Sequence, residues 1–242
     1  MIESVNNEKI KRYSKLNEKK YRDKENMFIV EGEHLVEEAL EKGIVIDIFS
    51  LEEKENSTRV SIEVMKKLSN LSNPPKILAV AKKIEERKIN GNVLVLDDIQ
   101  DPGNLGTIIR SAVSFGIDTI VASKNTVDVY NSKVIRATEG MLFKINYLKR
   151  DLVEFINANK DTLTFITTDV RTGKDIKDIE IPGNYALIMG NEGNGVSDAV
   201  SELVPNKVNI KISEKCESLN VSIATSILLY ELYTRFALVK KK

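Results

Sequence analysis

The feature that most constrains the fold is a regular alternation of short apolar runs and helical patterns from residue 93 onward. Strand patterns cover residues 93–96, 119–122, 163–167, 185–189 and 207–212. Helical patterns alternate with them at residues 105–115, 132–138, 151–158, 196–203 and 218–238. Such alternation specifies a largely parallel sheet covered by helices on both faces. We therefore expect an α/β domain whose ligands gather where strands end and loops begin.

The N-terminal third predicts a second, smaller α/β unit. The helical run EGEHLVEEALEKG ends at Gly43 and precedes the strand-like IVIDIF. Ser61 is placed to cap a further helix, which is followed by Pro74, Pro75 and the strand-like KILAVA. The charged stretch KKIEERKINGN lacks apolar periodicity, as is typical of a linker. We expect an N-terminal domain over residues 1–84, a linker over 85–92 and a C-terminal domain over 93–242.

Composition excludes several kinds of site. The chain has 36 basic and 36 acidic residues, so attraction to nucleic acid has to come from an uneven distribution of charge. With Cys216 and His34 each the only residue of its type, a disulfide framework and an ordinary zinc site are excluded, and no metal is expected. No signal-peptide core opens the sequence, and polar residues interrupt the apolar run 223–238, which argues against a membrane span. These features favour a cytoplasmic protein.

A basic block lies near the N-terminus, on a predicted helix. The segment 9–24 contains eight basic residues and only two acidic ones, Glu18 and Asp23. A phosphate-bearing partner is one interpretation, and a solvated helix face is the other; charge alone does not separate them. The basic residues are Lys9, Lys11, Arg12, Lys15, Lys19, Lys20, Arg22 and Lys24.

The first segment with chemical character is LDDIQDPGNLGTIIRSAVSFG. A buried strand runs into Asp97 and Asp98, and a Pro-Gly turn leads to a helix predicted to start near Asn104. A helix N-terminus that follows a glycine-containing turn favours the binding of anions, and Arg110 is placed to make a bidentate contact with a phosphate. The structural alternative is a tight turn with Arg110 extended into solvent, and this segment alone favours that alternative.

Two further segments place polar loops at strand ends. In YALIMGNEGNGVS the strand ends in the glycine-rich stretch 190–195, and Ser197 is placed to cap the next helix. Its glycine order fits neither a dinucleotide fingerprint nor a phosphate loop. In IKISEKCESLNVSIATSILLYEL a strand leads to Ser218, a predicted N-cap, with Asn220 and Ser222 in the first helical turn. Together the three loops indicate a ligand site.

The stretches DPGNLGTIIRSAVSFG, LIMGNEGNGVS and ESLNVSIATSILLYE resemble, in order, the three motifs of the SpoU (TrmH-like) branch of the SPOUT methyltransferases. VEGEHLVEEAL and its downstream strand resemble the small RNA substrate-binding domain of that branch's ribosomal RNA enzymes. The resemblance implies a deep trefoil knot formed by the second and third motifs, S-adenosylmethionine as cofactor and a homodimer through the catalytic domain. It implies methyl transfer to an RNA ribose 2′-hydroxyl. Ribosomal RNA is the favoured substrate, and transfer RNA is the alternative.

The resemblance also implies which residues form the site. Arg110 is expected to hold the phosphate beside the target ribose as a protonated guanidinium, while Asn104 and Asn220 orient the hydroxyl. The residues implied for catalysis are Arg110, Asn104, Glu192, Ser218 and Asn220. Those implied for cofactor binding are Thr168, Asp169, Gly190, Asn191, Gly193, Ile210 and Leu219.

Two other functions remain open from the sequence. The family commonly has Pro and Gly where this chain has Lys211 and Glu214, and small residues where it has Thr138 and Glu139. These departures leave room for a non-catalytic RNA-binding or ribosome-assembly protein that keeps the fold. A dinucleotide-dependent enzyme ranks third: Asp118 lies near the spacing of a ribose-binding acid, but the first turn lacks the three glycines.

Overall fold

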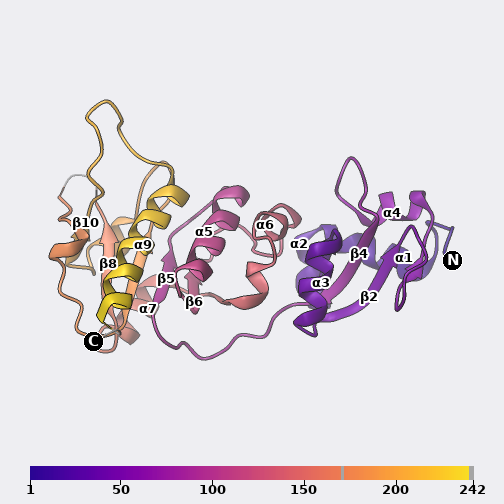
Figure 1. Ribbon diagram of the computed structural model, residues 1–242, viewed down its shortest axis with the longest axis horizontal. Helices are drawn as coiled ribbons and strands as arrows, with labels where there is room; N and C mark the ends of the chain where they lie inside the picture. The colour runs from indigo at the N-terminus through magenta and orange to yellow at the C-terminus, as the bar shows by residue number, and fades with distance from the viewer. Residues whose placement is uncertain (170–171, 240–242) are drawn as a thin grey trace. The chain divides into compact units, whose positions relative to one another are not determined.

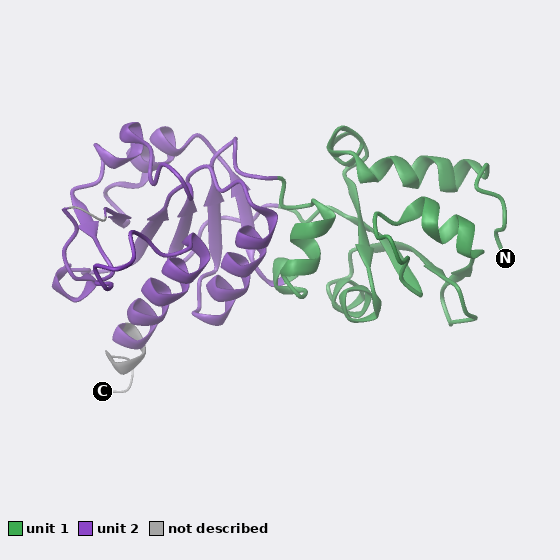
Figure 2. Ribbon diagram, turned by 90° about the horizontal axis from the view of Figure 1, so that it is seen from above, with its two compact units in different colours: residues 1–85, 128–143 green, residues 86–127, 144–242 purple. Residues whose placement is uncertain are grey.

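The chain divides into two compact units (Figure 2). The computed structural model describes residues 1–169 and 172–239. Unit 1 comprises residues 1–85 and 128–143, and unit 2 comprises the described residues of 86–127 and 144–242. This division differs from the predicted domains. Most of the predicted linker packs with unit 2, where Arg87 and Asn146 exchange two hydrogen bonds of 2.9 Å, and the segment 128–143 packs with unit 1.

Unit 2 is built on a six-stranded sheet in which every neighbouring pair is parallel (Figure 1). The strand order is β10-β8-β9-β5-β6-β7. The strands are β5 (Val93–Leu96), β6 (Thr119–Ala122), β7 (Asn146–Lys149), β8 (Thr164–Thr168), β9 (Tyr185–Met189) and β10 (Asn206–Val208). The prediction of an α/β fold with a mostly parallel sheet is confirmed.

Helices cover both faces of this sheet (Figures 1 and 2). On one face, Phe155 of α7 and Val200 of α8 share a buried apolar cluster with Val93 and Val95 of β5. Because successive strand residues point to opposite faces, Leu94 faces the other side, where α5 and α9 lie side by side. The helices are α5 (Pro102–Ser114), α7 (Leu152–Asn159), α8 (Asp198–Ser201) and α9 (Val221–Val239), with a 3-10 turn η3 (Ile176–Asp178).

Several predicted elements need correction. The strand predicted over 207–212 is β10, which ends at Val208, and the helix predicted over 196–203 is the four-residue α8. Strand β7 was not predicted, because its NYLK alternates between buried and half-buried positions and forms no continuous apolar run. By contrast, β5, β6 and β9 have their predicted bounds.

Unit 1 contains a four-stranded sheet of order β1-β4-β2-β3. Strands β1 and β2 both pair antiparallel with β4, and β3 pairs parallel with β2. Ile10 and Tyr13 of α1 share one apolar core with Val64 and Leu68 of α4, and Ser61 caps α4 as predicted. The elements are α1 (Glu8–Ser14), η1 (Lys15–Asn17), α2 (Lys19–Glu25), β1 (Met27–Glu31), α3 (Glu33–Glu41), β2 (Val45–Ser50), β3 (Thr58–Arg59), α4 (Ile62–Leu68), β4 (Ile77–Lys82) and α6 (Ser132–Ala137), with η2 (Met141–Lys144) at the unit boundary.

The basic block does not form the single helix that was predicted. It is divided into α1, η1 and α2, because Glu18 adopts an extended conformation between η1 and α2. Asn26, in the left-handed conformation with φ +53°, ends α2.

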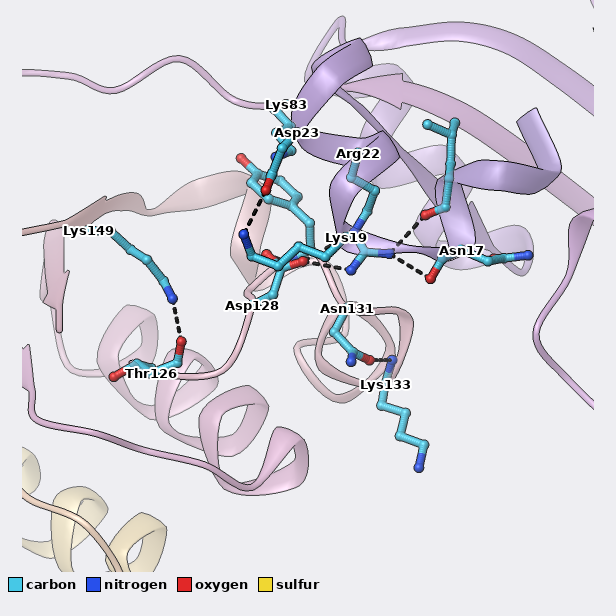
Figure 3. Close-up of polar contacts among 12 residues, drawn as sticks. Asn17, Lys19, Arg22, Asp23, Lys83, Thr126, Asp128, Asn131, Lys133 and Lys149 are labelled. Carbon is cyan, nitrogen blue, oxygen red and sulfur yellow. Dashed lines mark hydrogen bonds and ion pairs between the residues drawn. The ribbon is translucent and has the colours of Figure 1, made fainter. Parts of the chain in front are cut away.

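A buried ion pair attaches the segment 128–143 to the rest of unit 1 (Figure 3). The Arg22 guanidinium of α2 lies 2.7 Å from an Asp128 carboxylate oxygen, and their side chains are 7% and 13% exposed. The same guanidinium donates to the carbonyls of Leu16 and Asn17 at 2.8 and 2.9 Å. Among the described residues, the hydrogen-bond partners of the Arg22 guanidinium thus lie within unit 1.

Two further contacts hold the same segment. The buried carboxylate of Glu31 accepts hydrogen bonds from Arg136 of α6 at 2.5 Å and from the Ser69 hydroxyl at 2.6 Å. The rings of Phe28 and Tyr130 lie 4.7 Å apart. The segment is therefore part of the core of unit 1. No helix among the described residues is long and apolar enough to cross a membrane.

We expect Arg22→Ala to lower the free energy of unfolding by about 3–5 kcal/mol, because it leaves the Asp128 carboxylate buried without its counter-charge, with only the backbone N–H of Tyr130 as a hydrogen-bond donor among the described residues. The exposed Lys20–Glu18 pair supplies the control, since solvent screens this pair and Lys20→Ala should leave the free energy of unfolding nearly unchanged. Urea unfolding followed by circular dichroism measures both. Equal costs for the two variants would contradict a structural role for the buried pair.

Candidate active site

Side chains from all three motifs form one hydrogen-bonded line in unit 2. The Nδ2 of Asn104, in the first turn of α5, donates to Oε1 of Glu192 at 2.9 Å. The Nδ2 of Asn220, directly before α9, donates to Oδ1 of Asn104 at 3.0 Å. Asn104 thus connects residues that are 88 and 116 positions away in the sequence. The structure therefore brings side chains of the three motifs into contact.

The start of α5 positions Asn104. The helix begins at Pro102, two residues before the predicted start, and Asp101 is its N-cap. Oδ1 of Asp101 accepts a hydrogen bond from the backbone N–H of Asn104 at 2.8 Å. Proline suits the first helical position, because its φ is already helical and it has no N–H to satisfy. Since α5 follows β5, Asn104 lies at the carboxyl end of the sheet, where ligands of such folds bind.

Asn191 shapes the second-motif loop. Its Nδ2 donates to the carbonyl of Asp98 at 2.9 Å, and its Oδ1 accepts from the backbone N–H groups of Gly193 and Asn194 at 2.9 and 3.2 Å. The side chain therefore ties the loop to the end of β5 and closes the loop on itself. Glu192, the next residue, is held beside Asn104 as a result.

Two aspartates after β5 support this arrangement. Asp98 adopts the left-handed conformation with φ +59°, and the Ser123 hydroxyl donates to its carboxylate at 2.6 Å. The buried carboxylate of Asp97 accepts from the backbone N–H of Ser197 at 2.9 Å, at the start of α8. Ser197 occupies the N-cap position, but its side chain makes no capping hydrogen bond, so the predicted capping role is wrong.

In the third motif, Asn220 and not Ser218 caps the helix. Helix α9 begins at Val221, and Oδ1 of Asn220 accepts from the backbone N–H and the hydroxyl of Ser222 at 2.9 and 2.6 Å. The prediction that Ser218 is the N-cap is therefore wrong. Ser218 lies exposed in the preceding loop, where its carbonyl accepts from Cys216 Sγ at 3.2 Å.

Arg110 lies on α5, six residues after Asn104, with an exposed side chain. Its guanidinium makes no hydrogen bond or ion pair with the described residues. All five of its N–H donors are thus available, which is the geometry for forked binding of a phosphate.

Most of the predicted cofactor residues follow the ends of β8, β9 and β10, and Leu219 lies in the loop before α9. Thr168 is the last residue of β8, and the Asp169 carboxylate accepts from the backbone N–H and hydroxyl of Thr172 at 3.1 and 2.6 Å. Ile210 and Leu219 are half-buried, and within the described part of the chain their backbone N–H and C=O groups make no hydrogen bond.

At Gly190 the backbone of residues 195 and 196 lies closer than any side chain would allow. A Cβ at Gly190 would lie 2.1 Å from the carbonyl carbon of Gly195, which no side chain can accommodate. The backbone N–H and C=O groups of Ile210 and Leu219, which have no hydrogen-bond partner among the described residues, suit the hydrogen-bonding edge of an adenine. The residues present therefore fit the adenosine part of S-adenosylmethionine.

Sequence reasoning did not assign four residues that hold this site together: Asp97, Asp98, Asp101 and Ser222. The Asp-Pro pair at Asp101 was a readable signal, since aspartate before a first-turn proline is a common N-cap pattern. The contacts of Asp97 and Asp98 join loops distant in sequence, so no local signal exists for them. Ser222 contacts Asn220 two positions away, and that contact depends on which residue caps α9. No group of three or more potential metal ligands occurs among the residues that the structure describes.

The fold and the site define an α/β protein with three polar loops, joined by hydrogen bonds, at the carboxyl end of a parallel sheet. Residues 91–230 match the model of the SpoU rRNA Methylase family, and residues 7–79 match the MRM3-like substrate binding domain. The 23S rRNA (guanosine(2553)-2'-O)-methyltransferase RlmP of Bacillus subtilis is 37% identical, over 96% of this chain and 98% of the relative.

Solved structures agree with this match. The AdoMet-bound rRNA methyltransferase from Sinorhizobium meliloti has a TM-score of 0.86 at 26% identity and covers 97% of each chain. A structure described as an RNA 2'-O ribose methyltransferase has a TM-score of 0.80 at 29% identity, over 98% of this chain and 99% of that one. The chain belongs to the SpoU rRNA Methylase family, which confirms the resemblance that its three motifs indicated.

We expect Gly190→Ala to destabilise unit 2 by about 3 kcal/mol or to displace the second-motif loop, because its Cβ would collide with backbone atoms that cannot move away cheaply. Gly183→Ala is the control, since nothing lies within 4 Å of a Cβ there. Thermal unfolding and S-adenosylmethionine titration check both variants. Wild-type stability together with wild-type cofactor binding in Gly190→Ala would contradict this packing.

Proposed function

We propose that this chain transfers the methyl group of S-adenosylmethionine to a ribose 2′-hydroxyl of ribosomal RNA, with 23S ribosomal RNA as the leading substrate and the cytoplasm as its place of action. The observation that carries the proposal is the Glu192–Asn104–Asn220 line, with the unpaired Arg110 on the same helix as Asn104. The likeness to the Bacillus subtilis 23S ribosomal RNA enzyme over nearly the whole chain supports the substrate class.

The proposed cofactor supplies an electrophilic methyl group when bound. Gly190, Ile210 and Leu219 would hold its adenosine through backbone groups, with Thr168 and Asp169 at the neighbouring strand end. Asn191 and Gly193 contribute by fixing the loop that follows Gly190. The AdoMet-bound structure of the Sinorhizobium meliloti enzyme supports S-adenosylmethionine as the cofactor.

The remaining polar residues orient the RNA. Because a carboxylate only accepts hydrogen bonds, Glu192 fixes the Asn104 amide so that its oxygen faces Asn220. The two asparagines then orient the 2′-hydroxyl, and Arg110 binds the adjacent phosphate with a fork of N–H groups. A guanidinium stays protonated, so Arg110 stabilises charge and the phosphate or water accepts the hydroxyl proton. Ser218 stands in the loop before α9 as a further contact to the substrates.

Incubation of the purified protein with labelled S-adenosylmethionine and unmodified transcripts tests the proposal. The expected result is label in 23S ribosomal RNA and a 2′-O-methyl group on mapping. Label in transfer RNA transcripts alone would show that transfer RNA, and not ribosomal RNA, is the substrate. Calorimetry that detects no cofactor binding to folded protein would favour a non-catalytic RNA-binding protein.

Arg110→Lys should lower kcat/KM for methyl transfer by roughly 10- to 100-fold, because lysine keeps the charge but loses the fork worth about 1.5–3 kcal/mol. Arg87→Lys is the matched control: Arg87 is exposed, and the hydrogen bonds that hold it come from its backbone. Initial rates on the same transcript compare the two. Wild-type rates in Arg110→Lys would show that Arg110 does not bind the phosphate through a fork of N–H groups.

Two finer features of the architecture belong to the same proposal. We infer that the second and third motifs form a deep trefoil knot. We also infer that residues 1–84, with the segment 128–143 packed into their core, form an RNA substrate-binding domain joined by residues 85–92 to the methyltransferase domain. The family match over residues 91–230 and the substrate-binding match over residues 7–79 support both. The chain path in an experimental density map tests the knot.

Helix α9 supports a homodimer through the catalytic domain. Ile223, Ile227 and Tyr230 follow one face of the helix at spacings of four and three residues, and all are between 37% and 52% exposed. The ring of Phe115 on the adjoining α5 end lies 5.8 Å from that of Tyr230 and extends the apolar surface. A contiguous apolar face of this kind is usually covered by a partner, and we assign it to a second copy.

Ile227→Glu should convert the dimer to a monomer at micromolar concentration, because dimerisation would bury its carboxylate in an apolar interface. Leu203→Glu is the control, since Leu203 is similarly exposed in unit 2 but lies outside α9. Light scattering after size-exclusion chromatography gives both masses. A monomeric wild type, or an unchanged Ile227→Glu dimer, would reject this interface.

A further inference from the structure

The structure separates the cations of the basic block into paired and unpaired ones. Among the described residues, carboxylates lie within 4 Å of Lys9, Lys11, Arg12, Lys19, Lys20 and Arg22. Lys15 and Lys24 have no ion pair in the part of the chain that the structure describes. Most of the block therefore supports the fold of unit 1, and these two exposed lysines are available to an external anion.

The unpaired lysines line the same hollow. It has a volume of about 410 Å³ and lies between α1, η1, α2 and α4 of unit 1. Lys67 of α4, exposed and also without an ion pair, reaches this hollow because the apolar side of α4 packs against α1. The residues that line it are Glu8, Lys11, Arg12, Ser14, Lys15, Tyr21, Lys24, Glu25 and Lys67.

The charge of the hollow is positive after internal pairing. Arg12 and Glu25 are 2.5 Å apart and neutralise one another, and Lys11 lies 3.5 Å from Glu8. Lys15, Lys24 and Lys67 supply the excess. Tyr21 adds an aromatic ring 5.5 Å from the Nζ of Lys15. Lysines around an aromatic side chain suit a nucleotide strand, whose phosphates pair with ammonium groups and whose bases stack on rings.

We propose that this hollow binds the sugar-phosphate backbone of the RNA substrate outside the methylation site, with Lys15, Lys24 and Lys67 on phosphates and Tyr21 against a base. The inference rests on the proposed function and specifies which surface of the N-terminal unit contacts the RNA. A concave surface that combines a ring with three unpaired cations favours a nucleic acid strand over a flat anionic membrane.

A matched pair of triple variants tests the surface in the full-length protein. The test variant is Lys15→Gln, Lys24→Gln and Lys67→Gln. The control removes the same charge from exposed lysines of unit 1 outside the hollow: Lys42→Gln, Lys66→Gln and Lys82→Gln. Binding of an unmodified 23S ribosomal RNA transcript is measured by filter retention from low to high salt, together with methyl transfer and thermal unfolding.

We expect the test variant to bind RNA about tenfold or more weakly, and the slope of log affinity against log salt to fall by about 2 as three phosphate contacts are lost. The control should bind as the wild type does. Methyl transfer by the test variant should show a raised KM with kcat retained, because the residues of the hollow belong to unit 1 and the proposed methylation residues belong to unit 2. Unchanged binding by the test variant, equal loss in the control, or no binding by the wild type would each overturn the proposal.

The two proposals can fail separately. If the wild type binds the transcript through these lysines without methylating any RNA, the proposed methyl transfer is rejected and RNA binding by the hollow is retained. Full methylation with unchanged affinity in the test variant would keep the activity and remove the surface.

Discussion

The side-chain amide of Asn104 is the interaction on which the candidate site depends. An amide carries a donor and an acceptor on one rigid plane, so it can join two different partners in a defined order. Its nitrogen faces Glu192 and its oxygen faces the amide of Asn220. Asp101 fixes the backbone that carries it. The geometry of three distant loops is therefore set by one residue in the first turn of α5.

The sequence predicted the scaffold well where burial dictates local pattern. Strands β5, β6 and β9 are buried throughout, so each appears as a continuous apolar run and its ends could be read directly. The positions of the polar loops follow from those strands. Asn104, Glu192 and Asn220 could thus be placed in one region before any coordinates were known, although the motif resemblance was needed to name them.

What could not be predicted depends on contacts between distant segments. The left-handed conformation of Asp98 is stabilised by Ser123, and the loop of Asn191 is held by the Asp98 carbonyl. None of these contacts leaves a pattern in neighbouring residues. Ser218 and Asn220 show the same limit at short range, since both residue types cap helices well and only the structure shows that the helix begins after Asn220.

Unit 1 is not a continuous piece of chain, and this restricts how the protein can be divided or recombined. Arg22 meets its counter-charge at Asp128, 106 positions later, and Phe28 meets Tyr130. A fragment that stops at residue 85 would contain the buried Arg22 without Asp128 and the ring of Phe28 without that of Tyr130. Exchange of the N-terminal region between relatives would therefore succeed only if the segment 128–143 travelled with it, so two separate stretches of the gene must be inherited as one module.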